Sequence, residues 1–238
     1  PVLSNAQFEK FLEFFNKNIK VLDCTFNTNG NLKERLNELR LEAETAVREG
    51  GKHLVLSDKK INESKSPIPM ALTIGAINSK LVNLGIRGFA SINVQTSEVL
   101  DTHSFAVLLG VGATTINPYI AFDSIYQRYE KKLFGKISFE ECVQRYIKSV
   151  DNGLLKIMSK MGISVLSAYR GGCNFEAVGL SRSIVAEYFP GMVSRISGIG
   201  IAGLEKKIKK LHKKAFQKNV SILPIGGIYK YRKSGETH

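Results

Sequence analysis

Polar side chains that could do chemistry follow several apolar, strand-like runs of this sequence. Asp23 and Asp58 each stand near the end of one run, and Gln95 and Asn117 follow two later runs. The complete set at these predicted strand ends is Asp23, Ser57, Asp58, Gln95, Thr96, Asn117, Ser167, Tyr169 and Arg170. In parallel α/β folds ligands bind at the carboxyl ends of the strands, so a site is expected among these side chains.

The chemistry available to this set is limited. It holds two carboxylates, no histidine, and no nucleophile beside a base. Neither aspartate has a partner in its own run that would fit it for acid or base work. We therefore expect no catalytic residue in the chain. We interpret Asp23 and Asp58 as helix caps or loop hydrogen-bond acceptors, and a functional contact by either is the alternative.

The other candidate motifs are weak. Ser197-Gly198-Ile199-Gly200 precedes a predicted helix, where backbone N–H groups can hold an anion. The motif is not a full GxGxxG, so we interpret it as a tight turn and keep a phosphate site as the alternative. Cys24, Cys142 and Cys173 are widely spaced and form no CxxC pair, which predicts neither a metal site nor disulfides and favours the cytoplasm. We expect no cofactor-binding and no metal-binding residue.

The net charge of +13 arises entirely from residues 131–238, because basic and acidic residues balance before them. Much of it lies in a predicted amphipathic helix at 204–216. The apolar stripe of this helix is Leu204, Ile208, Leu211 and Ala215. We expect this stripe to be buried and the lysines and His212 to be solvated. The lysine face lacks interleaved aromatic residues, and no apolar run approaches the roughly 18 residues of a membrane span, so neither nucleic acid nor a membrane is expected as a partner.

The elements that would position these residues alternate between strand-like and helix-like. The runs typical of strands are 19–26, 53–58, 88–94, 113–117, 163–168 and 194–197. The segments between them have helical apolar spacing, with capping boxes at Ser4-x-x-Gln7 and Ser138-x-x-Glu141. This alternation predicts an α/β fold of parallel βαβ units. We expect an incomplete or distorted (β/α)8 TIM-barrel-like domain over 1–222, with a doubly wound sheet as the alternative, and an extended linker over 223–238.

Two stretches carry a distinctive pattern, DNGLLKIMSKMGIS at 151–164 and SAYRGGCNFEAVGL at 167–180. Shorter stretches that belong with them are 54–58, 67–70, 103–110, 117–119 and 227–238. Together they resemble the central domain of glutamate synthases, over essentially the whole chain. Cys173-Asn174 departs from the family pattern, which has a pair similar to Gln-Ile in this loop.

The resemblance implies that the chain is one part of a larger enzyme. Full-length glutamate synthase would transfer the amide nitrogen of glutamine to 2-oxoglutarate and reduce the product, giving two glutamates. An amino-terminal amidotransferase domain would release ammonia, and a carboxy-terminal domain with FMN and an iron–sulfur cluster would carry out the reduction. A small reductase subunit is a further partner, and the electron donor is left open between NADPH, NADH and ferredoxin. This chain would be the scaffold between the two domains and would help to wall an ammonia path.

Residues near the distinctive loop are the expected contacts with those domains or with the ammonia path. They are Ser159, Lys160, Met161, Tyr169, Arg170, Gly171, Gly172, Phe175 and Glu176. Arg170 offers a rigid fork for carboxylates or carbonyls, and Phe175 beside Glu176 is typical of an interface anchor. We expect Tyr169, Arg170 or Phe175 to be exposed when the neighbouring domains are missing. The alternative is an ordinary connecting loop.

Two other functions remain possible on sequence grounds. A small-molecule barrel enzyme would use Asp23, Asp58 and the Gly198–Gly200 turn. A nucleic-acid-binding domain would use the basic carboxy-terminal half. A bound flavin or sugar phosphate would favour the first, and a steep loss of nucleic-acid affinity with salt would favour the second.

Overall fold

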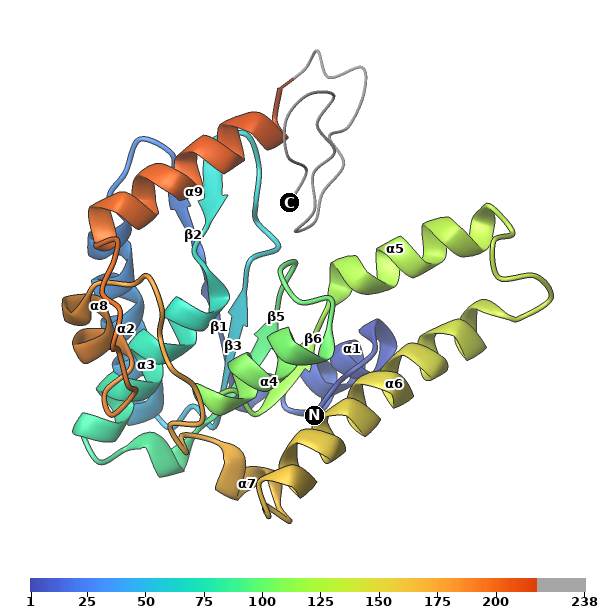
Figure 1. Ribbon diagram of the computed structural model, residues 1–238, viewed down its shortest axis with the longest axis horizontal. Helices are drawn as coiled ribbons and strands as arrows, with labels where there is room; N and C mark the ends of the chain where they lie inside the picture. The colour runs from blue at the N-terminus through green and yellow to red at the C-terminus, as the bar shows by residue number, and fades with distance from the viewer. Residues whose placement is uncertain (218–238) are drawn as a thin grey trace.

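The computed structural model describes residues 1–217 and shows an α/β fold built on a four-stranded parallel sheet (Figure 1). Its strands are β1 (Ile19–Asp23), β3 (His53–Ser57), β5 (Ser91–Gln95) and β6 (Thr115–Asn117), which lie side by side in chain order. The predicted α/β class and its parallel βαβ units are confirmed. The strand order does not reverse within the described residues, so the doubly wound alternative loses its support. The proposed linker at 223–238 and the boundary at 222 lie outside the described residues.

Helices connect and surround these strands. They are α1 (Asn5–Phe14), α2 (Leu32–Arg48), α3 (Met70–Asn83), α4 (Thr102–Gly110), α5 (Tyr119–Glu130), α6 (Phe139–Lys160), α7 (Leu166–Tyr169), α8 (Arg182–Tyr188) and α9 (Ile201–Ala215). The capping box at Ser4 and Gln7 is present and starts α1. Ser138 accepts a hydrogen bond from the N–H of Glu141 and starts α6. Within the described part of the chain, every helix is too short or too polar to cross a membrane.

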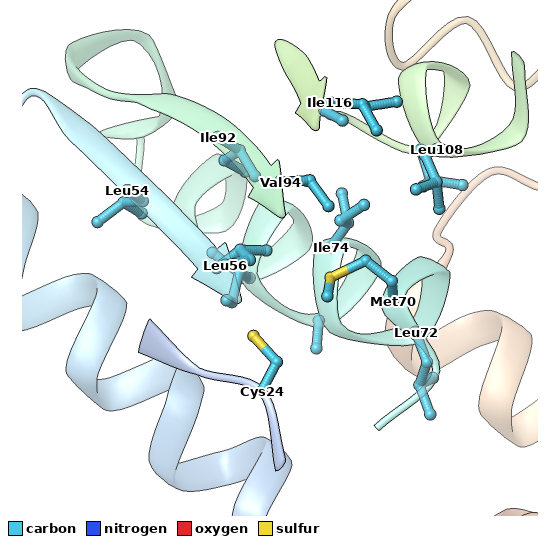
Figure 2. Packing of buried hydrophobic residues seen from close by; sticks show 14 of the residues in the cluster. Cys24, Leu54, Leu56, Met70, Leu72, Ile74, Ile92, Val94, Leu108 and Ile116 are labelled. Carbon is cyan, nitrogen blue, oxygen red and sulfur yellow. The ribbon is translucent and has the colours of Figure 1, made fainter. Parts of the chain in front are cut away.

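One face of the sheet forms the main core with α2, α3 and α4. Leu22, Leu56, Val94 and Ile116 occupy one register across the four strands, and none is exposed. They belong to one cluster with the side chains of α3, among them Ile74 (Figure 2). Each buried aliphatic side chain of this kind contributes about 1.5–3 kcal/mol, so the layer fixes how the strands lie against the helices.

The opposite face of the sheet is polar on β5 and β6 and also carries Val21 and Val55. His53, Ser91, Asn93 and Thr115 alternate with the core residues and therefore point to this side. The His53 Nδ1 and the Asn93 Nδ2 each lie 2.8 Å from the Ser91 Oγ, and the Thr115 Oγ1 donates to the Asn93 Oδ1 at 2.8 Å. The ring of Phe15, just after α1, lies 4.2 Å from the His53 ring. The first helix thus covers part of a hydrogen-bonded polar face.

A second, two-stranded antiparallel sheet lies beyond the carboxyl ends of the parallel strands. It pairs β2 (Thr25–Asn27) with β4 (Lys65–Pro67), and α9 contacts β4 and α2. The Glu205 Oε2 accepts the N–H of Leu32, the first residue of α2, at 2.8 Å. The Lys209 Nζ donates to the Gly30 carbonyl at 2.7 Å. These bonds hold α9 over the start of α2, where a carboxylate is favoured by the helix dipole.

The predicted phase of α9 was wrong by about one position. Leu211 is 58% exposed, whereas His212 is buried and its Nε2 lies 3.3 Å from the Glu63 carbonyl. Leu204 and Ile208 are partly buried against the core, whereas Ala215, also predicted to be buried, is exposed. Spacing of four residues from Leu204 leads to His212, so the contacting stripe ends on a histidine that finds a backbone partner. The lysines at 206, 207, 210, 213 and 214 are exposed, as expected.

Two predicted strands do not form. Residues 163–168 make a turn and the short helix α7, and 194–197 have no strand assignment. The reason lies at the outer edge of β6, where a fifth strand would be added. Val2 forms a parallel bridge with Ile116 there, and the Leu3 N–H donates to the Ile116 carbonyl at 2.9 Å. The amino terminus therefore occupies the edge, and no closed barrel forms within the described residues.

Candidate functional site

The carboxyl ends of the four parallel strands carry one row of polar side chains. Asp23, Ser57, Gln95 and Asn117 share a register, as the sequence predicted from their positions. The Ser57 Oγ donates to the Gln95 Oε1 at 3.0 Å, and the Gln95 Nε2 donates to the Asn117 Oδ1 at 3.3 Å. The Asn117 Nδ2 continues to the Asn5 Oδ1 at 2.9 Å. These groups satisfy one another and leave little for a substrate.

Asp23 serves the loop that follows β1. Its Oδ1 accepts from the Thr25 N–H at 3.2 Å and from the Thr25 hydroxyl at 2.7 Å, and its Oδ2 lies 3.3 Å from the Lys65 Nζ. Burial alone would raise the pKa of Asp23, but the Thr25 bond and the lysines Lys65 and Lys60 outweigh it and lower that pKa. This is the predicted hydrogen-bonding role.

Asp58 is the most buried carboxylate at this end of the sheet, at 1% exposure. Its Oδ2 accepts from the Thr96 hydroxyl at 2.8 Å, from the Ser97 N–H at 2.8 Å and from the Ser97 hydroxyl at 3.0 Å. Its Oδ1 is buried and has no hydrogen-bond partner among residues 1–217. Burial and the charge of Asp58 raise the pKa of Tyr119 and of the Cys24 thiol, so neither is an ionised nucleophile at neutral pH.

Glu98 is a neighbouring carboxylate that the sequence analysis did not select. Its Oε2 accepts the Met70 N–H at 2.8 Å, which caps the start of α3, where Pro69 offers no side-chain cap. Desolvation by the surrounding protein and the charge of Asp58 raise its pKa to about 7, against the effect of the Met70 bond, while the residue as a whole remains exposed to solvent, which weakens this shift. The sequence held one signal for this role. The helix after Pro67-Ile68-Pro69 begins without a side-chain cap of its own, so a distant acceptor for its first N–H groups could have been expected. No set of three His, Cys, Asp or Glu in the described part of the chain could hold a metal ion.

The Ser197–Gly200 segment requires glycine at position 198 because of close packing. A Cβ at Gly198 would overlap the backbone of Gly179. The Ile199 N–H donates to the Gly179 carbonyl at 2.9 Å, so this amide is not free to hold an anion. No turn forms at 197–200, where Ile199 instead bridges Leu180, so the tight-turn interpretation is wrong and the phosphate-site alternative loses the amide of Ile199.

The loop around Arg170 folds back onto α4 and the turn after it. The Arg170 Nε donates to the Ala113 carbonyl at 3.0 Å, and the Gly171 N–H donates to the Gly110 carbonyl at 2.8 Å. The ring of Phe175 packs on Gly110, where any Cβ would collide with it. The expected exposure of this loop is wrong for three side chains. Tyr169 is buried, and Arg170 and Phe175 are partly buried, because the loop finds its partners within the domain.

A second arginine reaches the same turn. The Arg87 Nη2 donates to the Gly112 carbonyl at 2.8 Å, next to the carbonyl that Arg170 binds. Burial and the nearby Arg170 lower the pKa of Arg87 to about 10. Arg170 therefore helps to clamp the turn between α4 and β6, in addition to any contact it makes outside the domain.

A recess of about 190 Å³ opens beside this loop, between α3, α4 and α8. The residues that line it are Asn78, Ser79, Val82, Gly110, Val111, Gly171, Cys173, Asn174, Phe175, Tyr188, Phe189, Pro190 and Met192. Two predicted contact residues, Gly171 and Phe175, belong to it. The Tyr188 hydroxyl is buried and has no hydrogen-bond partner within residues 1–217. Sequence reasoning missed the contribution of α8, because it depends on how distant segments meet.

The remaining predicted contact residues lie elsewhere. Ser159 and Lys160 line a shallow hollow on α6 together with Asn152, Leu155 and Lys156. Met161 ends this helix and is exposed. Gly172 and Glu176 are exposed beside the recess. The structure thus gathers the residues from 169 to 176 around one feature and places Ser159 and Lys160 at another.

A four-stranded parallel sheet whose strand-end side chains bond to one another, beside a recess lined by a long loop, defines the class of this chain as an α/β domain. Residues 1–181 match the family described as the glutamate synthase central domain. The chain belongs to this family.

Relatives align over the whole chain. The NADPH glutamate synthase large chain of Azospirillum brasilense is 48% identical and that of Bacillus subtilis is 38% identical, each over 100% of this chain. The chloroplastic ferredoxin-dependent glutamate synthase of Spinacia oleracea is 35% identical, again over 100% of this chain. The chain spans 16% of the length of each of these relatives.

Proposed function

We propose that the chain is the central scaffold domain of a glutamate synthase large subunit and joins a glutamine amidotransferase domain to an FMN and iron–sulfur synthase domain. The observation that carries the proposal is the family match over residues 1–181, together with relatives that extend far beyond this chain. The whole polypeptide would convert glutamine and 2-oxoglutarate to two glutamates by reduction. FMN and the iron–sulfur cluster would be bound outside this chain.

The self-satisfied strand ends support a scaffold role. In an α/β enzyme the carboxyl ends of the strands hold the reacting groups. Here Asp23, Ser57, Gln95 and Asn117 are engaged in bonds to one another and to the adjacent loops. The domain would position its neighbours and wall part of an ammonia path, using residues near the Arg170 loop and the carboxyl end of α6.

The fold also suggests a barrel ancestry. Four parallel strands in chain order, joined by helices, have the connectivity of half a (β/α)8 barrel. We propose that the domain retains four strands of such a barrel, with its edge closed by the amino-terminal residues instead of a fifth strand. The polar face under α1 would then correspond to the interior of the barrel.

The electron donor of the whole enzyme is proposed from similarity. The greater identity to the NADPH enzyme of A. brasilense, 48% against 35% for the S. oleracea protein, favours NADPH. A small reductase subunit would then deliver the electrons. Activity of the full enzyme with NADPH, and its absence with reduced ferredoxin, would test this choice.

The scaffold proposal is tested with Arg170→Ala in the full-length enzyme. Glutamine-dependent synthesis requires both active sites, whereas synthesis from free ammonia requires only the second. We expect the variant to lose at least about fivefold of the glutamine-dependent rate and much less of the ammonia-dependent rate. Arg145→Ala is the control, because Arg145 is exposed on α6 and, within residues 1–217, pairs only with Glu141 on its own helix.

A purely structural Arg170 would behave differently. Its loss would free the Ala113 carbonyl, lower the melting temperature and reduce both activities in proportion. Equal losses, or no loss in either assay, would remove this loop from the proposed coupling between the two active sites.

A further inference from the structure

Residues 176–181 and 193–199 lie side by side next to the recess and are joined by two isolated β-bridges, without forming regular strands. Glu176 bridges Val193 and Leu180 bridges Ile199, both in parallel orientation. The Ala177 N–H donates to the Val193 carbonyl at 2.8 Å. Two further bonds of this kind run from Gly179 to Ile196 at 3.1 Å and from Ser181 to Ile199 at 2.9 Å. We call this feature the 176–199 ribbon.

One edge of this ribbon is open. In an extended segment, successive N–H groups point to opposite sides. Residues 177, 179 and 181 donate to the partner segment, and Gly179, at a φ of +80°, bends the chain between Val178 and Leu180. Neither donates a backbone hydrogen bond within residues 1–217. An edge of this kind is a template for a further strand.

The ribbon also exposes apolar side chains. Val178 and Ile196 are 64% and 61% exposed, and Val193 and Ile199 are exposed as well. The Ser194 hydroxyl is buried without a hydrogen-bond partner in the described residues. Four exposed β-branched residues on two paired segments are more than isolated surface side chains, and such groups commonly mark contact surfaces.

The recess begins where the ribbon begins. Cys173, Asn174 and Phe175 precede its first segment, and Pro190 and Met192 precede its second, and all five line the recess. Its volume of about 190 Å³ lies below the range of about 300–1,000 Å³ typical of small-molecule pockets, so one large side chain fits it better than a free ligand. An open edge beside a side-chain pocket is the arrangement by which sheets bind extended segments.

We infer that the 176–199 ribbon and its recess bind an extended apolar segment from another domain of the same polypeptide. The relatives have about six times the length of this chain, since it spans 16% of them, and that length supplies the partner. The segment pairs with the amides of Val178 and Leu180 and inserts one large apolar side chain into the recess. This inference rests on the proposed function only in taking the chain as one domain of a longer protein.

Thiol labelling of the full-length protein tests the contact without relying on activity. Cys173 is exposed in this domain and lines the recess, whereas Cys24 and Cys142 are buried. Val178→Cys and Ile196→Cys, each in a Cys173→Ser background, add probes on the ribbon. Maleimide reaction is followed at each site by peptide mass spectrometry.

The matched controls are Leu41→Cys on α2 and Phe89→Cys before β5, which are 60% and 71% exposed in this domain. We expect the two ribbon probes and native Cys173 to react at least about tenfold more slowly than both controls, because labelling would require the contact to open. Equal rates would overturn the inference. Protection that disappears on dilution would also overturn it, because the occupant would then be a second copy of the protein.

A second variant separates the contact from the fold. Ile196→Asp places a charge on an exposed position and should leave the melting temperature of the domain unchanged. It should raise the labelling rate of Cys173 at least about fivefold by weakening the interface, whereas Phe89→Asp should not. An unchanged Cys173 rate with Ile196→Asp would refute the contact. If Arg170→Ala changes both activities equally while the ribbon probes still react slowly, the coupling role of the loop is rejected and the contact at the 176–199 ribbon stands.

Discussion

Asp58 is predicted to be the strongest single polar contributor to the carboxyl end of the sheet. The change to test is Asp58→Ala. It removes the acceptor of three hydrogen bonds, two from Ser97 and one from the hydroxyl of Thr96. Thr96 is fully buried, so its hydroxyl proton is left without an acceptor and without water, while its oxygen still accepts the Glu98 N–H at 3.2 Å.

The expected cost follows from these bonds. A buried, unsatisfied hydroxyl costs about 1–3 kcal/mol, and hydrogen bonds to a charged acceptor contribute about 1.5–3 kcal/mol each. Ser97 is only half-buried, so water replaces part of its loss. We expect Asp58→Ala to lower the free energy of unfolding by about 3–5 kcal/mol, which is a fall in melting temperature on the order of 10 °C for a domain of this size.

The assay is urea unfolding followed by circular dichroism, with two comparison variants. Asp58→Asn keeps one acceptor oxygen and should cost only about 1–2 kcal/mol. Asp101→Ala removes an exposed cap of α4 that binds the N–H of Ser104 at 2.8 Å, and should cost about 1 kcal/mol. If Asp58→Ala costs no more than Asp101→Ala, the buried-acceptor reasoning is refuted. If Asp58→Asn is stable but abolishes synthesis in the full enzyme, Asp58 has a functional contact.

Three further outcomes are expected. The pKa of Glu98 is raised to about 7 from an ordinary 4.5, so the folded state holds the Glu98 proton more tightly than the unfolded state. The free energy of unfolding therefore falls as the pH rises from 4.5 to 7. Glu98→Gln should flatten this part of the curve when urea midpoints are measured across a pH series. Gly198→Ala should break the close approach to Gly179 and accelerate proteolysis of the adjoining loops, and an unchanged digestion pattern would contradict it. Leu211→Ala should lower the free energy of unfolding by less than about 0.5 kcal/mol, because Leu211 is exposed, and His212→Ala should lower it by more than about 1 kcal/mol. The reverse order would support the phase of α9 that the sequence predicted.

Local signals in the sequence predicted much of the framework. The run 53–58 became β3 and the run 113–117 contains β6, because continuous apolar residues suit strands covered on both sides. Ser4 and Ser138 start helices where their capping motifs predicted. The row of strand-end polar residues followed from the same reading, since parallel strands in one sheet bring their carboxyl ends together.

What the sequence could not predict depends on which distant segments meet. The run 163–168 has strand-like composition, but Val2 already occupies the edge of β6 that it would need. His212 lies four residues after Ile208 on the contacting stripe, but its polar partner, the Glu63 carbonyl at 3.3 Å, comes from a distant segment that the sequence does not indicate. The recess likewise requires α8 to approach α3 and α4. Such features are set by tertiary contacts, which override local pattern.

Two of the five buried side-chain oxygens that lack a hydrogen-bond partner within residues 1–217, those of Tyr188 and Ser194, lie beside the recess and the 176–199 ribbon, and the others belong to Asp58, Ser66 and Asp151. At the strand ends, Ser57, Gln95 and Asn117 bond to one another, and only the Asp58 Oδ1 is left without a partner within residues 1–217. Beside the recess, the open edge at Val178, four exposed β-branched side chains and the buried hydroxyls of Tyr188 and Ser194 remain unmatched in the same range. Buried polar groups and open strand edges are costly unless they are paired. The rest of a longer polypeptide can pair them, so the 176–199 ribbon, and not the strand ends, is where this domain is expected to act.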